Sequence, residues 1–197
     1  MVQQSKQFCL EDLPQKPLMV SVLAGVSLQS LKNAFPSHDC VRAVPNTPSL
    51  VSAGLTAIAW KKEITSNQKK VVRELFAPTS EVFDLPEEQL DAFLALTSSG
   101  PGYLALIAEA LADGAVAAGL SRALSYSLTK KTIAGTAKLL LEKNLQPSEL
   151  KDMVASPGGT TIAAIRHLEK SGLRSALIEA VLIAKKRSQE LSFYKNS

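Results

Sequence analysis

The distribution of hydrophobic and polar residues changes near Pro86 and divides the chain into two parts. In the first part, stretches with helical spacing at 28–35 and 66–76 alternate with short apolar, β-favouring runs at 18–24, 41–44, 55–60 and 81–84. The run 18–24 ends at a glycine, as a buried parallel strand does, and Ser27 is a candidate N-cap for the helix that follows. The pattern predicts a small α/β unit.

Beyond Pro86 the periodicity is helical at 87–96, 102–118, 122–143 and 172–191, with a shorter helix at 162–168. The second of these stretches is apolar over much of its circumference, with Leu104, Ile107 and Leu111 among many alanines. One antiparallel neighbour covers only part of such a surface, so we expect it to be buried against a second subunit. The protein is therefore predicted to be mostly helical overall.

The predicted sheet of the first part is incomplete for a free-standing nucleotide-binding domain. A doubly wound domain normally has more than two or three βα units, and none of those in this chain carries a glycine-rich phosphate turn. The sequence thus predicts an α/β remnant, whose first units lie upstream, followed by an all-α domain.

Composition and charge exclude several classes of protein. The 197 residues are 46% hydrophobic and 20% charged, which is ordinary for a globular protein, and two cysteines with two histidines predict no metal site. The apolar runs are expected to be too short or too interrupted for the ~20-residue span of a bilayer, and the N-terminus has no secretory signal. The net charge of +4 is spread over the chain, so we expect no nucleic-acid partner. The cytoplasm is the default compartment.

The segment Leu150–Thr161 predicts a short polar turn that leads directly into the helix 162–168. Gly158 and Gly159 allow backbone N–H groups to approach a ligand closely, and the helix dipole attracts a carboxylate by roughly 0.3–1 kcal/mol. Ser156, Thr160 and Thr161 add hydroxyl groups. A capped turn that binds nothing explains the same residues equally well.

Two further segments are candidates for function. Asn46 and Thr47 follow a strand and lie between Pro45 and Pro48, where a rigid, non-helical turn can orient a cofactor amide or ribose. A tight turn, with the asparagine bonded to its own backbone, is the alternative that the residues alone favour. The segment 99–103 breaks one helix and starts the next, and Tyr103 is expected to point its hydroxyl inward.

The sequence resembles the pyrroline-5-carboxylate reductase family in its longest motif. L-K-D-x-V-x-S-P-G-G-T-T-I, followed by G-L-R-S-A-L-I-E-A-V and K-R-S-Q-E-L, is similar to the family's signature region. The segments V-P-N-T-P, S-G-P-G-Y and A-L-A-D-G also resemble family motifs and occur in the family's order. The chain departs from the family pattern at Ser98, where glycine is usual, and at Gly102, where alanine is usual.

The resemblance implies reduction of 1-pyrroline-5-carboxylate to L-proline with NADPH or NADH in proline biosynthesis. It implies that the turn holds the substrate carboxylate through Ser156, Gly159, Thr160 and Thr161, with Val154 close to the ring. Ser156 and Thr161 are then the catalytic candidates. For the cofactor it implies contacts from Val22, Leu23, Ala24, Asn46, Thr47 and Glu87. An acidic residue at a helix start, such as Glu87, is alternatively only a dipole partner.

The resemblance also predicts the domain organisation. Residues 1–86 are expected to be the C-terminal portion of a Rossmann-like NAD(P)-binding domain, without its G-x-G-x-x-G turn, and residues 87–197 a helical dimerisation and substrate-binding domain. A homodimer through the helical domain is expected, and a higher homo-oligomer is allowed. A truncated gene product, a start codon assigned too late or a separate function would each account for the absent portion. The alternative function is a catalytically impaired interaction module derived from the family.

Overall fold

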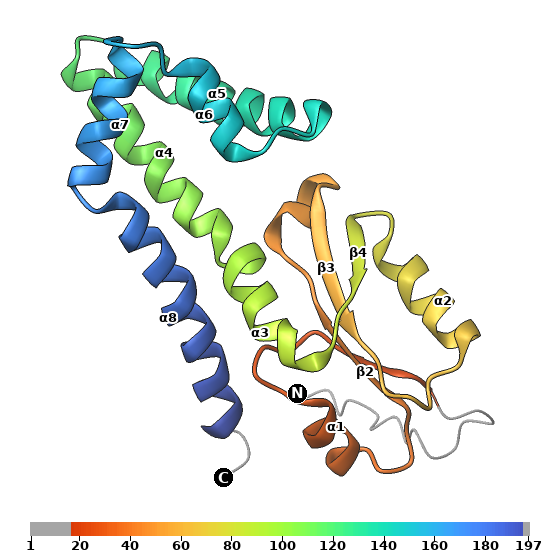
Figure 1. The fold of residues 1–197 in the computed structure, drawn as a ribbon. Helices are drawn as coiled ribbons and strands as arrows, with labels where there is room; N and C mark the ends of the chain where they lie inside the picture. Colours follow the sequence, from red (N-terminus) through yellow and green to blue (C-terminus); the bar gives the residue numbers. More distant parts are fainter. Residues whose placement is uncertain (1–16, 195–197) are drawn as a thin grey trace, which may run out of the picture. The chain divides into compact units, whose positions relative to one another are not determined.

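The computed structural model describes residues 17–194 of the protein. These residues form two compact units, which are considered separately (Figure 1). The first unit contains residues 17–99 and 181–194, and the second contains residues 100–180. The C-terminal part of the last helix therefore belongs to the unit that carries the sheet.

The first unit is built on a four-stranded sheet with the order β1-β2-β3-β4. The strands are β1 Met19–Ser21, β2 Cys40–Val44, β3 Gly54–Ala59 and β4 Ser80–Asp84, so the four predicted strands are present. β1 is shorter than predicted because its pairing with β2 ends where Ser21 lies opposite Arg42. β1 and β2 are parallel, as are β3 and β4, whereas β2 and β3 are antiparallel. A short 3₁₀ helix, η2 (Thr47–Val51), joins β2 to β3, and it is too short for a parallel crossover.

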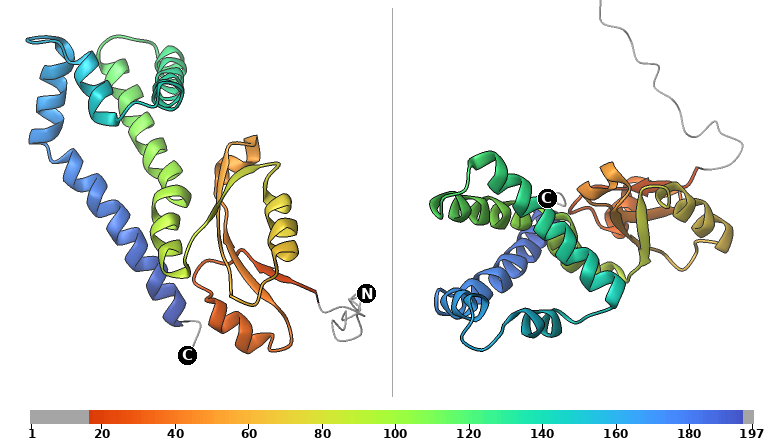
Figure 2. Two further views of the ribbon diagram at one scale, coloured as in Figure 1. Left: turned by 45° about the vertical axis from the view of Figure 1, so that its right-hand side comes forward. Right: turned by 90° about the horizontal axis from the view of Figure 1, so that it is seen from above.

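Helices cover both faces of this sheet. α1 (Leu28–Ala34) packs Leu28 and Leu31 into one core cluster, and α2 (Ser66–Phe76) packs Val72 into the other. Ser27 caps α1 as predicted, since its side chain accepts a hydrogen bond from the Ser30 amide. The views in Figures 1 and 2 show α2 on the opposite side of the sheet from the start of the next helical segment.

That segment, predicted as one helix over 87–96, has three parts. A 3₁₀ turn η3 (Glu87–Gln89) leads into α3 (Leu90–Phe93) and then into a π-helical turn η4 (Leu94–Ser98), in which the Ser99 amide donates to the Leu94 carbonyl over 3.1 Å. Leu90 and Ala95 are completely buried. Because Leu90 lies in the core cluster with α1, this segment closes one face of the sheet.

The second unit is entirely helical. It contains α4 (Gly100–Ala117), α5 (Arg122–Lys143), α6 (Pro147–Val154), α7 (Thr160–Lys170) and the first part of α8 (Leu173–Tyr194). α4 and α5 pack against each other, and small side chains are buried in this unit at Ala112, Ser125 and Thr129. The fold class predicted from the sequence, a small sheet of α/β type followed by helices, is confirmed.

Helix α6 corrects the prediction of a polar turn over Leu150–Thr161. Residues up to Val154 are helical, and only residues 155–159 form the turn. α6 begins with Pro147 at its first position, and the Gln146 amide donates to the Glu149 carboxylate over 2.6 Å. These are ordinary helix-start signals, so the turn is shorter and more sharply defined than predicted.

The expectation that no apolar segment is long enough to cross a membrane is also corrected. Within residues 17–194 one helical stretch, Glu87–Ala117, has sufficient length and apolar composition. It reaches this length because η3, α3, η4 and α4 follow one another without a break. Its first part, residues 87–99, belongs to the first unit and packs on the sheet through Leu90.

Candidate functional site

The Ser-Pro-Gly-Gly motif at 156–159 forms a tight turn between α6 and α7. The Gly159 amide donates to the Ser156 carbonyl over 3.0 Å, which closes a β-turn with Pro157 and Gly158 at its centre. Gly158 has a φ of 69°, in the left-handed region that a type II turn requires at this position. Proline followed by glycine therefore fixes this turn locally.

Helix α7 starts directly at the end of the turn. Gly159 is its N-cap residue, and no described side chain caps it, whereas Ser27, Thr65 and Ser121 cap α1, α2 and α5. The backbone amides of the first turn of α7 are thus left for another acceptor. A helix N-terminus of this kind suits a carboxylate, because its N–H groups and its dipole both favour a negative charge.

The residues predicted to bind substrate lie together around this helix start. Val154 is the last residue of α6 and is exposed, Ser156 and Gly159 lie in the turn, and Thr160 and Thr161 open α7. Ser156 lies so close to Gly159 that a Cβ atom on Gly159 would be 2.6 Å from the Ser156 Oγ atom. The absence of a side chain at Gly159 therefore leaves room for the Ser156 hydroxyl next to it.

The residues predicted to contact the cofactor lie in the first unit, and all except Glu87, which follows β4, lie where β1 and β2 end. Because these strands are parallel neighbours, the loops after their carboxyl ends share one edge of the sheet. Val22, Leu23 and Ala24 follow β1, and the first two are 54% and 56% exposed. Such an edge is where α/β sheets commonly bind ligands.

Asn46 lies at the same edge, but its side chain is almost entirely buried. Its Nδ2 atom donates to the Thr97 carbonyl over 3.0 Å, and its Oδ1 atom accepts from the Leu55 amide over 2.8 Å. The Asn46 side chain therefore does not bond to its own backbone. It connects the loop to β3 and to the π-helical turn η4. Thr47 is exposed and begins η2, which corrects the expectation of a non-helical turn between the prolines.

A hollow of about 350 Å³ adjoins this loop. It is lined by Pro45, Asn46, Thr47, Ser49, Leu50 and Ser98. Exposed apolar side chains beside a hollow at the carboxyl edge of a sheet suit the flat nicotinamide end of NADPH or NADH. The 197 residues contain no G-x-G-x-x-G for the pyrophosphate. The residues that are present therefore fit the nicotinamide end of the cofactor.

The two departures from the family motif are accommodated. Ser98 donates from its hydroxyl to the Pro45 carbonyl over 3.2 Å, so the added hydroxyl links η4 to the same loop. A Cβ atom at Gly102 would have no described atom within 4 Å, so the alanine usual at this position would also fit. Tyr103 points inward as predicted, and its hydroxyl donates to the Ala180 carbonyl over 3.4 Å.

The Glu87 carboxylate contacts two other residues of the first unit. Its Oε1 atom accepts from the Leu28 amide over 2.7 Å and lies 3.5 Å from Nη1 of Arg42. Arg42 also lies 3.6 Å from Asp91, and these two residues were missed by the sequence-based reasoning. The available signal was an arginine inside the apolar run 41–44, where an unpaired charge is very costly.

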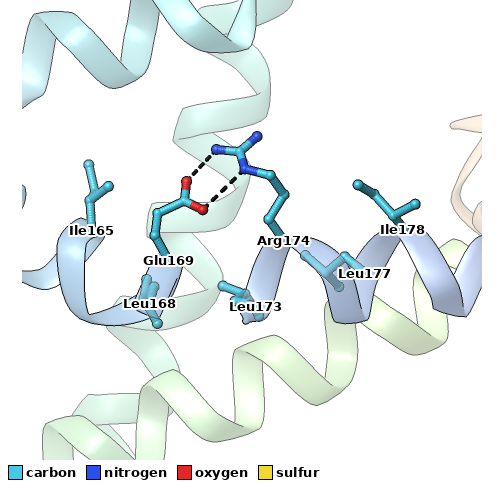
Figure 3. Close-up of a pocket in the computed structure, with 7 residues that line it drawn as sticks. All are labelled: Ile165, Leu168, Glu169, Leu173, Arg174, Leu177 and Ile178. Carbon is cyan, nitrogen blue, oxygen red and sulfur yellow. Dashed lines mark hydrogen bonds and ion pairs between the residues drawn. The ribbon is translucent and has the colours of Figure 1, made fainter. Parts of the chain in front are cut away.

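An open apolar groove of about 380 Å³ marks the junction of α7 and α8. It is lined by Ile165, Leu168, Glu169, Leu173, Arg174, Leu177 and Ile178, and by none of the predicted site residues. Figure 3 shows Glu169 and Arg174 pointing toward each other, with two bonds between the guanidinium and the carboxylate. These bonds lower the pKa of Glu169 below its ordinary value.

The predicted site residues thus form two groups. The substrate group lies in the second unit, and the cofactor group lies in the first. The substrate group is assembled from residues close together in the sequence, whereas the cofactor group also depends on bonds between distant segments, such as that of Asn46 with Thr97.

Comparison with known proteins identifies the family. The family model for pyrroline-5-carboxylate reductase dimerisation matches residues 87–191. The pyrroline-5-carboxylate reductase of Synechocystis sp. is 50% identical over 176 residues, which cover 89% of this chain and 66% of the relative. That of Glycine max is 41% identical over 180 residues, with coverage of 91% and 66%. The chain therefore spans slightly less than two thirds of the length of these relatives.

Solved structures of the same name have the same fold. The crystal structure of Plasmodium falciparum pyrroline carboxylate reductase with NADP bound matches with a TM-score of 0.85 and 31% identity. The match covers 89% of this chain and 71% of that one. The enzyme from Streptococcus pyogenes matches with a TM-score of 0.85 and 30% identity, over 92% of this chain and 70% of that one. On the match of its helical part and on the identity with these relatives, the chain belongs to the pyrroline-5-carboxylate reductase family.

Proposed function

We propose that this protein acts in proline biosynthesis as a pyrroline-5-carboxylate reductase, an oxidoreductase that reduces the C=N bond of 1-pyrroline-5-carboxylate to give L-proline. The observation that carries the proposal is the start of α7, where a Ser-Pro-Gly-Gly turn precedes a helix that has no described side-chain cap. The names of the relatives support the reductase over the alternative of an interaction module.

In the proposed mechanism the turn holds the substrate carboxylate. The amides of Thr160 and Thr161 donate to the carboxylate at the helix N-terminus, and the hydroxyls of Ser156 and Thr161 add further donors. Val154, the exposed last residue of α6, lies just before the turn in the chain and contacts the ring of the substrate. Held at one end in this way, the substrate has its C=N carbon fixed in one orientation.

NADPH or NADH, when bound, supplies the hydride. On the protein side, Val22, Leu23 and Ala24 offer an apolar surface to the nicotinamide end, and Thr47 offers a hydroxyl at the same sheet edge. Asn46 keeps the loop in place through Leu55 and Thr97, and Glu87 belongs to this group through the start of α1.

The proposed domains are residues 1–86, as part of a Rossmann-like nucleotide-binding domain, and residues 87–197, as the domain for dimerisation and substrate binding. A homodimer through the second domain is supported by the family model for dimerisation. It is also supported by many exposed apolar side chains on α4, α5, α7 and α8, among them Leu106, Leu141, Ile178 and Ile183. A cytoplasmic location completes the proposal.

The carboxylate site is tested by titration with L-proline, the proposed product. The variant Thr161→Val removes one hydroxyl with almost no change of shape, and we expect it to weaken proline binding roughly tenfold, the effect of one hydrogen bond to a charged group. Thr132→Val is the matched control, because Thr132 is exposed on α5 and is not part of the turn. Equal affinities in both variants and in the unchanged protein would remove the site from the proposal.

The homodimer is tested by sedimentation at micromolar concentration. Ile178→Glu places a charge in the groove of α7 and α8, where the native side chain is 54% exposed, and we expect it to shift the protein toward monomer. Leu75→Glu, at a position 64% exposed on α2 outside residues 87–197, should leave the dimer intact. A monomeric profile of the unchanged protein would contradict the dimer.

A further inference from the structure

A buried ionic cluster lies beneath the loop that we assign to the nicotinamide. Arg42, on the second strand of the sheet, is only 4% exposed, and its guanidinium faces two carboxylates. Nη1 lies 3.5 Å from Oε1 of Glu87, and Nη2 lies 3.6 Å from Oδ1 of Asp91. The carboxylates are 30% and 15% exposed. A buried guanidinium needs such partners, and here they come from the segment just after the sheet.

Glu87 connects this cluster to the loop. The oxygen that faces Arg42 also accepts a hydrogen bond of 2.7 Å from the Leu28 amide, the first N–H of α1. Leu28 follows the segment Val22–Ser27, hereafter the cofactor loop. The other end of this loop leaves β1 at Ser21, whose register partner on β2 is Arg42 itself. One end of the cofactor loop is therefore paired with Arg42 in the sheet, and the other end is connected to Arg42 through Glu87.

The first half of the cofactor loop has little support of its own, whereas Gly25 is buried and Val26 packs against the core cluster. Val22, Leu23 and Ala24 are exposed, and Gly25 adopts a φ of 71° at the bend that leads into α1. Ser27 caps α1 by accepting from the Ser30 amide, which leaves the Leu28 amide to Glu87. The Glu87 carboxylate thus adds a bond at the point where the loop enters α1, beside the packing of Val26.

Asp91 completes the cluster on its other side. Its Oδ1 atom accepts a hydrogen bond of 2.7 Å from the hydroxyl of Ser188, which is buried on α8. With this contact, Arg42 keeps a second carboxylate close to it when the charge at position 87 is removed. The functions of the two carboxylates are therefore separable: Asp91 balances the charge of Arg42, and Glu87 holds the loop.

We propose that Glu87, held in place by Arg42, is a positioning residue that fixes the cofactor loop for the nicotinamide end of NAD(P)H. It acts through the Leu28 amide and does not itself touch the cofactor. This inference rests on the function proposed above, of which it deepens the cofactor side.

The test uses reduced nicotinamide mononucleotide, which contains the nicotinamide and its ribose but not the adenosine half of the cofactor. Its binding to the full chain is followed by the fluorescence of the reduced nicotinamide, and the melting temperature of every variant is measured in parallel. Glu87→Ala removes the acceptor for Leu28, and we expect its affinity to fall at least about fivefold. Glu87→Gln keeps an oxygen in the same place, so it should restore binding to within about twofold of the unchanged protein.

Two further variants separate positioning from general stability. Glu88→Ala changes the neighbouring exposed carboxylate, which has no described hydrogen bond or ion pair, and it should bind like the unchanged protein. Glu87→Asp keeps the charge for Arg42 but is one methylene too short to reach the Leu28 amide. We expect it to bind weakly at a nearly normal melting temperature, which keeps the test valid if Glu87→Ala does not fold.

The outcomes are distinct. If Glu87→Ala and Glu87→Asp bind the mononucleotide as well as the unchanged protein, the inference is wrong and the cofactor assignment stands. If the unchanged protein does not bind the mononucleotide, the inference and the cofactor assignment fall together. Proline binding at the start of α7 is measured separately, so the substrate side of the proposed function is judged by its own result.

Discussion

Gly159 offers the most direct test of the carboxylate turn. With a φ of −80° and a ψ of 175°, its backbone is one that alanine also adopts, so Gly159→Ala introduces no backbone strain. A Cβ atom at this position, however, would lie 2.6 Å from the Ser156 Oγ atom and 3.2 Å from the Ser156 carbonyl oxygen. The serine hydroxyl must therefore rotate away from the start of α7.

The expected losses of stability and of proline affinity follow from the rotation of the Ser156 hydroxyl. Moving one side chain to another rotamer costs ~1 kcal/mol or less in the free energy of unfolding. Removing the serine hydroxyl from a carboxylate, and placing a methyl group beside the first amides of α7, costs about 1.5–3 kcal/mol of binding, or roughly 10- to 100-fold in affinity. Gly159→Ala should thus weaken binding far more than it lowers stability.

Gly158→Ala is the matched comparison, because it should lower stability more than it weakens proline binding. Gly158 has a φ of 69°, and a Cβ atom on it would have no described atom within 4 Å. The substitution should lower the free energy of unfolding by ~1 kcal/mol, the cost of the left-handed conformation, and leave the hydroxyl of Ser156 in place.

Calorimetric titration with L-proline, combined with thermal melting, distinguishes the two effects. The double variant Ser156→Ala with Gly159→Ala should lose little more affinity than Gly159→Ala alone, since both changes remove the same hydroxyl. If Gly159→Ala binds proline as well as the unchanged protein, the start of α7 does not receive the carboxylate, and the reasoning about the turn is refuted.

Three further predictions concern stability. Gly54→Ala should lower the free energy of unfolding by about 3 kcal/mol in denaturant titration, because its Cβ atom would lie 2.7 Å from the Thr79 carbonyl oxygen; Gly135→Ala, in open space on a helix, should not be destabilising. Arg42→Met should cost about 3 kcal/mol in the same assay, because it leaves two largely buried carboxylates without their cation; a neutral effect would mean that the cluster is not needed for folding. Glu169→Gln should lower the melting temperature slightly at neutral pH. Since Arg174 depresses the pKa of Glu169 in the folded state, this difference should be lost as the pH falls below about 4.5, and a pH-independent difference would contradict the assigned cause.

Those parts of the fold that depend on local signals were predictable from the sequence. The bounds of α2 and α5 agree with the predicted ranges, and Ser27 caps α1, because a Ser or Thr cap and hydrophobic periodicity act within a few residues. Helix α6 had comparable signals in Pro147 and Glu149, but the glycines that follow led to the prediction of a longer turn.

Other parts depend on contacts between distant segments, which a local pattern does not contain. The π-helical turn η4 presents the Thr97 carbonyl to Asn46, 51 residues earlier in the chain. Glu87 reaches the Leu28 amide across 59 residues, and Asp91 reaches Ser188 across 97. The substrate turn could be predicted from the sequence because all its members lie within a few residues of each other. The positioning cluster was missed because each of its bonds joins segments far apart.

The exposed apolar residues of the helical unit can be assigned to a protein partner on physical grounds. In the apolar stretch Glu87–Ala117, the part before Gly100 packs on the sheet, where Leu90 and Ala95 are completely buried. Only α4 is then left, and at 1.5 Å per residue its 18 residues span about 27 Å, slightly less than the ~30 Å hydrocarbon core of a bilayer. The exposed leucines and isoleucines also extend over α5, α7 and α8, which carry lysines, arginines and glutamates along their length. Large exposed apolar patches bordered by polar residues are typical of a surface that another protein subunit covers, and the family model for dimerisation matches this same region.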